Sequence, residues 1–516
     1  MTADARAAGR TLTPWALGAV AVSSLTMVLT AAFGPSAASP DLGSATGWQA
    51  ALPPWSIGFH ASSALVTGLV DGAYLLGAIG VALGLWAAYR GERLPPAALV
   101  AAGGVAVLAV LVAPLGSADH VSYAAYGRIA AGGGDPYAVP PQTWHGGHDP
   151  VTGAVEPPWT TTPSIYGPVA TAVQALCSLV GGDSLRLTVW CWQLVCLAAW
   201  LAAGWLVLLL CRNAFGGPDG PQVQRAAWVW LLNPVLFGVL LVGAHVDLLG
   251  AALAIGALAV AGRRRVLGGP GWTGPLLAGV LLGASVGVKV TFALFGPALL
   301  FALWRRDRGQ FWRPSLAGVL GAALVLVPAQ LWAGAHTFDQ LSRARRFVSL
   351  ATPWRPFVEW VTGPVSNAVV RDAVVWLTPL VVLGLAVLLW LLVRPGERVV
   401  AEPAQVSVDA AGVAVVLGAA YVLGAPYSLP WYDAVVWAPL ALVAVPALDA
   451  LLLARLVAYA VAYVPGRVIG SSQRVQDLTL GYRRGWAPWI GLALWLALAL
   501  LALRVPRPRG PARSPR

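Results

Sequence analysis

The sequence predicts an all-α polytopic membrane protein, and three observations support this fold class. Only 10% of the 516 residues are charged, against about a quarter in an ordinary globular chain. The chain is 58% hydrophobic, with a mean hydropathy of +0.72. About a dozen apolar stretches approach the roughly 20 residues that a membrane-spanning helix requires. A soluble, disordered or fibrous chain of this composition would expose far too much apolar surface, so those classes are excluded.

Arginines orient the N-terminal spans, because cytoplasmic loops are enriched in positive charge. Arg6 and Arg10 precede the first apolar stretch, and Arg90 and Arg93 follow the second. The loop between these stretches has no arginine. We therefore expect a cytoplasmic N-terminus, an uncleaved first anchor rather than a signal peptide, and an outer segment after the third span. These three expected spans are 15–33, 66–89 and 97–115.

The stretch 166–180 decides the orientation of the middle of the chain. If it crossed the membrane, the triplet Arg263, Arg264 and Arg265 would lie outside, against the positive-inside tendency. We therefore expect a short helix that lies at the outer interface.

The remaining spans follow from the same rule. The stretch 274–304 has arginine clusters at both ends and is too long for one helix, so we expect two short helices broken near Gly287, with Lys289 near the outer side. The other expected spans are 187–210, 226–241, 246–261, 316–332, 373–393 and 406–424, followed by two apolar runs and an arginine-rich tail. We place the tail inside because four arginines disfavour an outer location: Arg467, Arg474, Arg483 and Arg484.

The chain thus divides into three parts. We expect residues 1–96 to form N-terminal membrane helices, residues 97–433 to form a membrane core with outer loops 116–164 and 336–372, and residues 434–516 to form C-terminal membrane helices and the tail.

This topology gathers the polar residues on the outer side. The histidines and acids expected there are His60, His120, His145, His148, His245, His336, Asp119, Asp135, Asp149, Glu156, Asp247 and Asp433. The net charge of +12 does not indicate a nucleic-acid partner, because the arginines flank apolar spans as membrane anchors do. The cysteines, expected to be small buried hydrophobic residues, are Cys177, Cys191, Cys196 and Cys211.

Asp119 is the first candidate catalytic residue. It lies four residues beyond Leu115, at the outer end of the third span, and precedes a loop rich in tyrosine and tryptophan. A carboxylate there can accept a proton from a sugar hydroxyl while aromatic faces hold the sugar. The alternative is an acid that caps the helix which follows it.

Lys289 is the only lysine among the 33 basic residues, and it lies inside an apolar stretch. An ionisable group in such a place usually faces a cavity or a partner, and a phosphate is an obvious partner. Arg343, Arg345 and Arg346 follow in an outer segment, where their guanidinium groups suit phosphate oxygens. The alternatives are a lysine that extends to the membrane interface and arginines that contact anionic lipid headgroups.

Two further motifs have structural interpretations. His145-x-x-His148-Asp149 has a possible metal spacing but no further ligands nearby, so we expect no metal. The turn Pro426-Tyr427-Ser428-Leu429-Pro430-Trp431-Tyr432 has two prolines and three aromatic residues. It is a membrane-interface anchor or a lipid or sugar contact, and the anchor is favoured.

Several motifs between about residues 97 and 433 resemble, in order and spacing, the actinobacterial polyprenol-phosphate-mannose-dependent α-1,6-mannopyranosyltransferases of lipomannan synthesis, members of the C superfamily of glycosyltransferases (GT-C). The matching motifs are Asp119 to Arg128, Gly134-Asp135-Pro136-Tyr137, Tyr166-Gly167-Pro168, Asn233-Pro234 with His245 and Asp247, the Lys289 region, and Pro430-Trp431-Tyr432. One departure is that His120 and Val121 follow the acid, where the family has an aliphatic residue and then a tyrosine.

The resemblance implies a GT-C-type fold with about 12 to 14 membrane helices and large outer loops that carry short interfacial helices. It implies that mannose moves from polyprenol phosphate mannose to a growing α-1,6-mannan or lipomannan-type glycolipid, with inversion and with Asp119 as general base. Lys289, Arg343, Arg345 and Arg346 would bind the donor phosphate. The implied sugar or acceptor residues are His120, Tyr123, Tyr126, Arg128, Asp135, Tyr137, Tyr166, His245, Asp247, Trp431 and Tyr432. No cofactor is implied, and the site would face the outer side of a bacterial plasma membrane.

Two other functions remain open from the sequence. A secondary transporter or lipid flippase would also place Lys289 in a broken helix, although its polar residues should then lie near the membrane midplane. A GT-C enzyme with another polyprenol-phosphate sugar, such as arabinose or glucose, would use the same residues.

Overall fold

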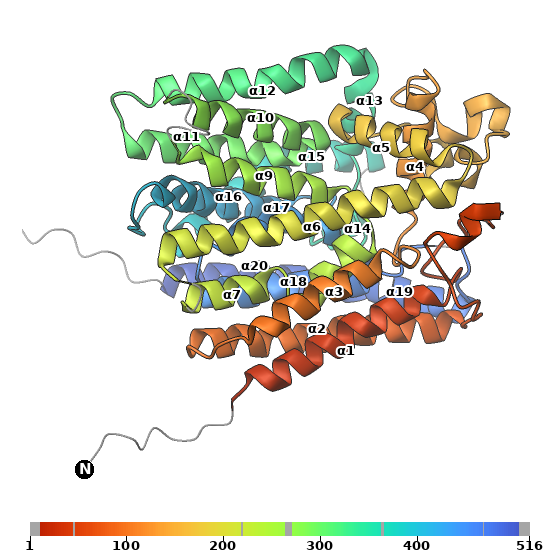
Figure 1. Ribbon diagram of the computed structural model, residues 1–516, viewed down its shortest axis with the longest axis horizontal. Coiled ribbons are helices and arrows are strands. Elements are labelled where there is room, and N and C mark those ends of the chain that lie inside the picture. Colours follow the sequence, from red (N-terminus) through yellow and green to blue (C-terminus); the bar gives the residue numbers. More distant parts are fainter. Residues whose placement is uncertain are drawn as a thin grey trace, which may run out of the picture.

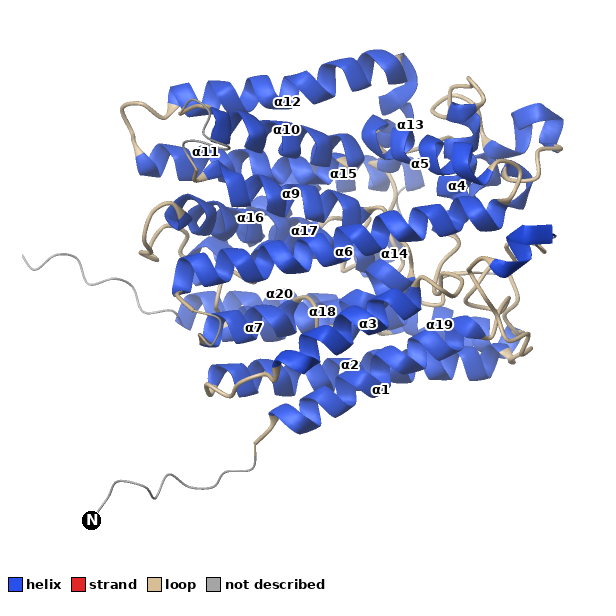
Figure 2. Ribbon diagram, viewed as in Figure 1, coloured by secondary structure: helices blue, strands red, loops and turns tan. Residues whose placement is uncertain are grey.

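The computed structural model describes residues 11–44, 47–217, 220–263, 271–362, 366–467 and 469–504. Within these residues, the regular structure is helical apart from two isolated β-bridges (Figure 2). Nine helical segments are long and apolar enough to cross a membrane in this described part of the chain. The predicted all-α polytopic fold class is therefore confirmed. Arg6, Arg10, Arg264 and Arg265, which orient the spans in the prediction, lie outside the described residues.

The helices run side by side along one direction of the bundle (Figure 1). Those of the first half are α1 (Thr13–Ala32), α2 (Ser63–Tyr89), α3 (Pro96–Ala109), α6 (Leu185–Phe215), α7 (Pro221–Val229), α8 (Pro234–Leu236) and α9 (Asp247–Ala261). Those of the second half are α10 (Thr273–Val288), α11 (Phe295–Arg306), α12 (Trp312–Ala333), α15 (Asn367–Val393), α16 (Ala404–Gly424), α17 (Ala434–Leu440), α18 (Pro446–Tyr463), α19 (Gln473–Gly485) and α20 (Ala487–Arg504).

Shorter elements lie in the connections between these helices. They are α4 (Asp119–Ala131), α5 (Pro168–Gly181), α13 (Asp339–Ala344) and α14 (Trp354–Thr362), the π-helix η5 (Phe237–Val242), and the 3₁₀ turns η1 (Gly47–Ala51), η2 (Pro141–Gly147), η3 (Thr152–Ala154), η4 (Trp159–Thr161), η6 (Val290–Leu294), η7 (Ala335–Phe338) and η8 (Pro430–Asp433).

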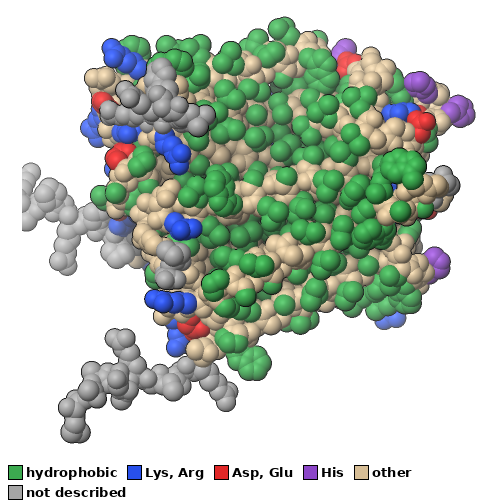
Figure 3. Space-filling model, in the orientation of Figure 1, with side chains coloured by type: hydrophobic (Ala, Val, Ile, Leu, Met, Phe, Trp, Pro, Cys, Tyr) green, Lys and Arg blue, Asp and Glu red, His purple; other side chains and the backbone are tan. Residues whose placement is uncertain are grey.

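The two ends of the bundle differ in charge. Lysine and arginine side chains gather at the left end of Figure 3, histidines gather at the right end, and the surface between them is mostly hydrophobic. We call these the arginine end and the loop end; the loop end is the one that carries α4 and α5 (Figure 1). This polarity agrees with a predicted cytoplasmic arginine end and a predicted outer loop end.

Helix α5 stands beside α4 at the loop end, as expected for a helix that does not cross the membrane (Figure 1). The two helices approach closely at Gly127, where a Cβ atom would lie 2.3 Å from the carbonyl oxygen of Gln174. Next to Gly127, Arg128 donates a hydrogen bond of 3.3 Å to the carbonyl of Gly182, the residue that follows α5. The next helix, α6, therefore begins at the loop end and has 31 residues in which to cross the membrane.

Helix α12 attaches to the bundle mainly through α10. Only 11% of its most apolar window is buried, so it lies at the periphery and depends on close backbone contact rather than on a large buried side-chain face. A Cβ atom on Gly279 would lie 1.9 Å from the carbonyl oxygen of Gly318, and one on Gly321 would lie 2.1 Å from that of Leu276. Small residues at helix contacts allow this approach in membranes, where hydrophobic burial between helices supplies little driving force.

The prediction that the arginines after α18 and the loop 116–164 lie on opposite sides of the membrane was wrong for Arg467. Arg467 pairs with Glu156 of the large loop through a bond of 2.9 Å from Nε, and Ser472 donates to Ser63 at the start of α2. Arg474 lies in the first turn of α19 beside this contact, and Arg483 donates to the carbonyl of Ala462 near the end of α18. A buried, paired arginine such as Arg467 carries no free positive charge, so the positive-inside rule does not apply to it. Helices α19 and α20 then run toward the arginine end (Figure 1).

Candidate functional site

Asp119 is the first residue of α4, and residues 110–118 connect it to the end of α3. Backbone hydrogen bonds from Leu115 to Val242 and from Gly116 to Ala38 fix the connection between the two helices. The N-cap residue of α4 is Ala118, and no side-chain hydrogen bond caps the helix. The Asp119 side chain is 18% exposed. The alternative that Asp119 only caps α4 is therefore not supported, and its carboxylate faces a partly open space.

Lys289 forms a buried ion pair with Asp247, the first residue of α9. Its Nζ atom lies 2.7 Å from Oδ1 of Asp247 and 3.5 Å from the centre of the Tyr432 ring. Lys289 is extended, with φ −155° and ψ 128°, so helix α10 ends there and the lysine joins α10 to η6. Only 8% of the residue is exposed, which rules out a lysine that extends to the membrane interface. A buried ion pair of this kind is retained only where the geometry compensates for lost hydration.

His245 lies in the turn between η5 and α9 and contacts the base candidate. Its Nδ1 atom is 2.6 Å from the carbonyl oxygen of Val239. A carbonyl only accepts, so Nδ1 carries the proton, and Nε2 of the neutral ring is an acceptor. Nε2 lies 3.0 Å from Oγ of Ser117 and 3.6 Å from Oδ2 of Asp119. Burial lowers the pKa of His245 to about 3, so the ring is neutral.

Asp119, Asp247, Lys289 and His245 form one group at the loop end, which we call the polar cluster. Burial raises the pKa of Asp119 to about 6; the charge of Asp247 adds to the increase, while Lys289 and a hydrogen bond with Tyr123 oppose it. The cluster contains two carboxylates and one ammonium, and the charge of Lys289 acts electrostatically on both carboxyl groups. The Lys289 ammonium pairs with Asp247 and also attracts the Asp119 carboxylate, so it offsets part of the repulsion between the two acids.

Aromatic rings line the polar cluster. Tyr123 makes an edge contact with Tyr166 at 4.9 Å and with Trp192 at 5.6 Å between ring centroids. Tyr126 lies 6.3 Å from Tyr166. Tyr166 is held close to the lysine because the next residue, Gly167, donates a 3.0 Å hydrogen bond to the carbonyl of Val288. Aromatic walls of this kind suit the apolar faces of a sugar ring.

Trp431 and Tyr432 complete the wall from η8. Trp431 stacks on His245 with ring centroids 3.9 Å apart and planes 14° apart, and Tyr432 lies beneath Lys289. They are 6% and 8% exposed. The predicted preference for a membrane-interface anchor was therefore wrong, because an anchor would present its rings to lipid headgroups.

Other predicted sugar or acceptor residues stabilise the loops instead. Arg128 forms ion pairs with Asp149, at 2.8 Å, and with Asp183. The Asp135 carboxylate accepts from the backbone N–H of Tyr137 at 2.8 Å, and the hydroxyls of Tyr137 and Thr171 lie 2.8 Å apart.

His120 is buried beside the site, and burial lowers the pKa of its ring to about 3. Asp149 of the possible metal motif is occupied by Arg128 and by the backbone N–H groups of Val151 and Thr152. Among the described residues, no group of three or more His, Cys, Asp or Glu side chains could hold a metal.

The three predicted phosphate-binding arginines line a separate cavity of about 440 Å³ on α13, together with Asp339 and Ser342. The cavity contains Arg343, Arg345 and Arg346. Arg346 also pairs with Asp372 at 3.1 Å. Rings connect this segment to the polar cluster: Phe347 lies 5.8 Å from Tyr427, which lies 6.3 Å from Tyr432. The structure therefore places these arginines near the cluster but not in contact with Lys289.

Two residues of the site were not predicted from the sequence. Ser117 bonds both His245 and the backbone N–H of Asp119, the latter at 3.3 Å. Trp192 contacts Tyr123 and donates a 2.8 Å hydrogen bond to the carbonyl of Ala244. Ala244 has a φ of 52°, an unusual value for a non-glycine residue that often marks a functional turn. The position of Ser117, two residues before the acid, is the only sequence feature that points to it.

The amino-acid sequence of this chain matches a family of known proteins. A family model described as "Alpha-(1->6)-mannopyranosyltransferase, N-terminal domain" matches residues 16–305. Alpha-(1->6)-mannopyranosyltransferase B of Corynebacterium glutamicum is 32% identical over 227 residues, which are 42% of this chain and 37% of that protein. Alpha-(1->6)-mannopyranosyltransferase A of Mycobacterium tuberculosis is 29% identical over 42% of this chain and 39% of its own length. The matches thus span less than two fifths of the length of these relatives.

Solved membrane proteins show a weaker similarity. ArnT from Cupriavidus metallidurans, bound to undecaprenyl phosphate, has a TM-score of 0.41 and 15% identity, over 78% of this chain and 76% of that one. The archaeal oligosaccharyltransferase AglB from Archaeoglobus fulgidus, in complex with an inhibitory peptide and a dolichol-phosphate, has a TM-score of 0.38 and 13% identity, over 78% of this chain and 55% of that one.

Proposed function

We propose that this chain, which belongs to the alpha-(1->6)-mannopyranosyltransferase family, is a membrane mannosyltransferase that uses polyprenol phosphate mannose as donor. Its acceptor is a growing α-1,6-mannan or lipomannan-type glycolipid. The observation that carries the proposal is the polar cluster, where a partly exposed acid, Asp119, lies beside the buried Lys289–Asp247 pair and under an aromatic wall. The cluster offers a base, a cation for a phosphate and stacking surfaces for a sugar.

Asp119 acts as the general base of this reaction. Its carboxylate takes the proton of an acceptor hydroxyl as the oxygen of that hydroxyl attacks the anomeric carbon of mannose. With a pKa of about 6, the acid is mostly ionised at neutral pH and is more basic than an ordinary aspartate. Attack opposite the departing phosphate inverts a β-linked donor to an α-linked product.

Lys289 stabilises the leaving group. As the bond from the anomeric carbon to the phosphate oxygen breaks, its electron pair stays on that oxygen, and a nearby ammonium lowers the energy of the charge. Asp247 and the Tyr432 ring hold the ammonium in place before substrate arrives. Arg343, Arg345 and Arg346 remain predicted ligands of the donor phosphate, and their shared cavity supports that role.

The polarity of the bundle supports a site on the outer face of a bacterial plasma membrane. The polar cluster lies at the loop end, opposite the end where the surface arginines gather (Figure 3). The long lipid tail of a polyprenol donor lies in the bilayer, so its phosphate reaches the protein at the membrane edge.

The experiment that tests this function is a donor panel. Purified protein in liposomes is supplied with labelled polyprenol phosphates that carry mannose, glucose or arabinose, together with a short α-1,6-linked mannolipid. We expect transfer of mannose alone, into an α linkage that an α-1,6-specific mannosidase removes. Transfer of another sugar, or of none, would contradict the proposal.

A further inference from the structure

The segment between α16 and α17 forms one wall of the polar cluster. This segment contains η8, whose Trp431 stacks on His245 and whose Tyr432 lies beneath Lys289. Outside η8 and its cap, the described backbone hydrogen bonds within residues 425–433 are limited to that from Tyr432 to Leu429. The positions of the two rings must therefore be fixed from outside the segment.

Hydrogen bonds from Ser349 and Thr352 hold the Pro426 carbonyl, and a buried guanidinium holds the remainder of the segment. Arg455 of α18 is 1% exposed. It donates to the carbonyl of Val422 from Nε at 3.1 Å and from Nη2 at 2.8 Å, and to Oγ of Ser428 at 2.6 Å. It also forms an ion pair with Asp433, the residue after Tyr432. Because the donors of an arginine form a rigid fork, one side chain fixes the start, middle and end of residues 422–433.

We propose that Arg455, paired with Asp433, is a positioning residue of the site, which holds Trp431 against His245 and Tyr432 beneath Lys289. Neither residue of the pair contacts the reacting groups, and both act through the rings of η8. Loss of the pair lets η8 shift, which uncovers the ammonium of Lys289 and removes the stacking partner of His245.

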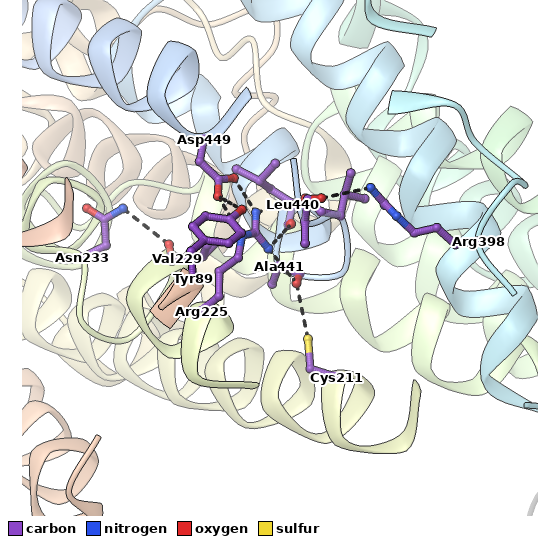
Figure 4. A network of polar contacts seen from close by, with 11 residues as sticks. Tyr89, Cys211, Arg225, Val229, Asn233, Arg398, Leu440, Ala441 and Asp449 are labelled. Carbon is purple, nitrogen blue, oxygen red and sulfur yellow. Dashed lines mark hydrogen bonds and ion pairs between the residues drawn. The ribbon is translucent and has the colours of Figure 1, made fainter. Parts of the chain in front are cut away.

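A second buried pair at the opposite end of α17 provides a matched comparison (Figure 4). Arg225 of α7 pairs with Asp449 of α18, with Nε 2.7 Å from Oδ2. It also donates to carbonyls at the C-terminal end of α17, at 3.1 Å to Leu440 and 3.0 Å to Ala441. The Tyr89 hydroxyl donates to the same carboxylate at 2.6 Å. Both pairs thus join α18 to the ends of α17, but only the Arg455 pair adjoins the rings of the polar cluster.

The first test uses Lys289 itself as the reporter. It is the only lysine in the sequence, so an N-hydroxysuccinimide ester that reacts with amines reports on its exposure once peptide mass spectrometry separates it from the N-terminal amine. We expect Asp433→Asn to increase the labelling rate of Lys289 at least about threefold, because reaction of a buried group follows its local opening. Asp449→Asn, with the same change in the same kind of pair, should leave the labelling rate unchanged.

The second test rests on the proposed function. In mannose transfer, Asp433→Asn should lower kcat by about tenfold, since small displacements of a positioned group are costly, and Asp449→Asn should stay within about twofold of wild type. Thermal unfolding of both variants shows whether their losses of stability match. Ser428→Ala, which removes only one hydrogen bond of Arg455, should give a smaller increase in labelling and serves if Asp433→Asn does not fold.

The two readouts separate the inference from the function. If wild type transfers no mannose, the proposed function is wrong, but the labelling contrast still tests the positioning role. Equal labelling in Asp433→Asn and Asp449→Asn, or unchanged labelling in both Asp433→Asn and Ser428→Ala, would overturn the inference.

Discussion

The pKa of Asp119 predicts the acid limb of the pH profile. With a pKa of about 6, about nine tenths of the molecules have an ionised base at pH 7 and about one tenth at pH 5. A protonated carboxyl cannot accept the acceptor proton, so activity is present above this pKa and is lost as the pH falls through it. We expect the rate of mannose transfer to fall about tenfold between pH 7 and pH 5, with a slope of one proton.

The assay is the initial rate of mannose transfer in liposomes, measured at subsaturating donor across this range. The unfolding temperature at each pH shows that the protein remains folded. The neighbouring histidines do not contribute to the profile between pH 5 and pH 7, because burial lowers the pKa of His120 and of His245 to about 3. A profile that is flat from pH 5 to 7.5, or a limb near pH 4 as for an ordinary aspartate, would refute the assignment of a buried base.

Three further predictions follow from the same geometry. Lys289→Met should raise the KM for the donor by at least about tenfold, and it leaves Asp247 without its 2.7 Å partner. Lys289→Arg should retain part of the activity. An unchanged dependence of Lys289→Met on donor concentration would exclude a role in phosphate binding. Replacement of Arg343, Arg345 and Arg346 by glutamine should weaken donor binding without changing the acid limb, since none of them belongs to the polar cluster; equal affinity for the donor would assign them to lipid headgroups instead. Gly279→Leu should destabilise the protein by about 1–3 kcal/mol in thermal unfolding, because its side chain would meet the α12 backbone. At Gly296 a Cβ atom meets nothing within 4 Å, so Gly296→Leu should leave the unfolding temperature near that of wild type.

The sequence was most informative where the length of an apolar stretch and the arginines at its ends determine the structure. The break at Lys289 was predictable because the stretch 274–304 is too long for one helix and has arginines at both ends, and the structure ends α10 at that lysine. The turn at His245 and Asp247 was predictable because it separates two apolar stretches of spanning length. These features depend on local sequence, so they did not require knowledge of tertiary contacts.

The missed features all depend on contacts between distant segments. Arg467 appeared cytoplasmic because its partner, Glu156, lies 311 positions away in the chain. Trp431 resembled a membrane anchor because nothing near it in the sequence reveals the stack on His245. The same is true of Arg455, which lies inside the apolar stretch of α18 and whose partners, Asp433 and Val422, belong to another segment.

The most direct test of the central claim compares Asp119→Asn with Asp183→Asn in mannose transfer from polyprenol phosphate mannose. The two variants undergo the same chemical change, but Asp183 lies on the exposed surface of the loop end and pairs only with Arg128 among the described ion pairs. Loss of a general base predicts a decrease of about 10² to 10⁴ in kcat for Asp119→Asn, with normal folding and donor binding, and activity near that of wild type for Asp183→Asn. Full activity in Asp119→Asn, or an equal loss in both variants, would contradict the account.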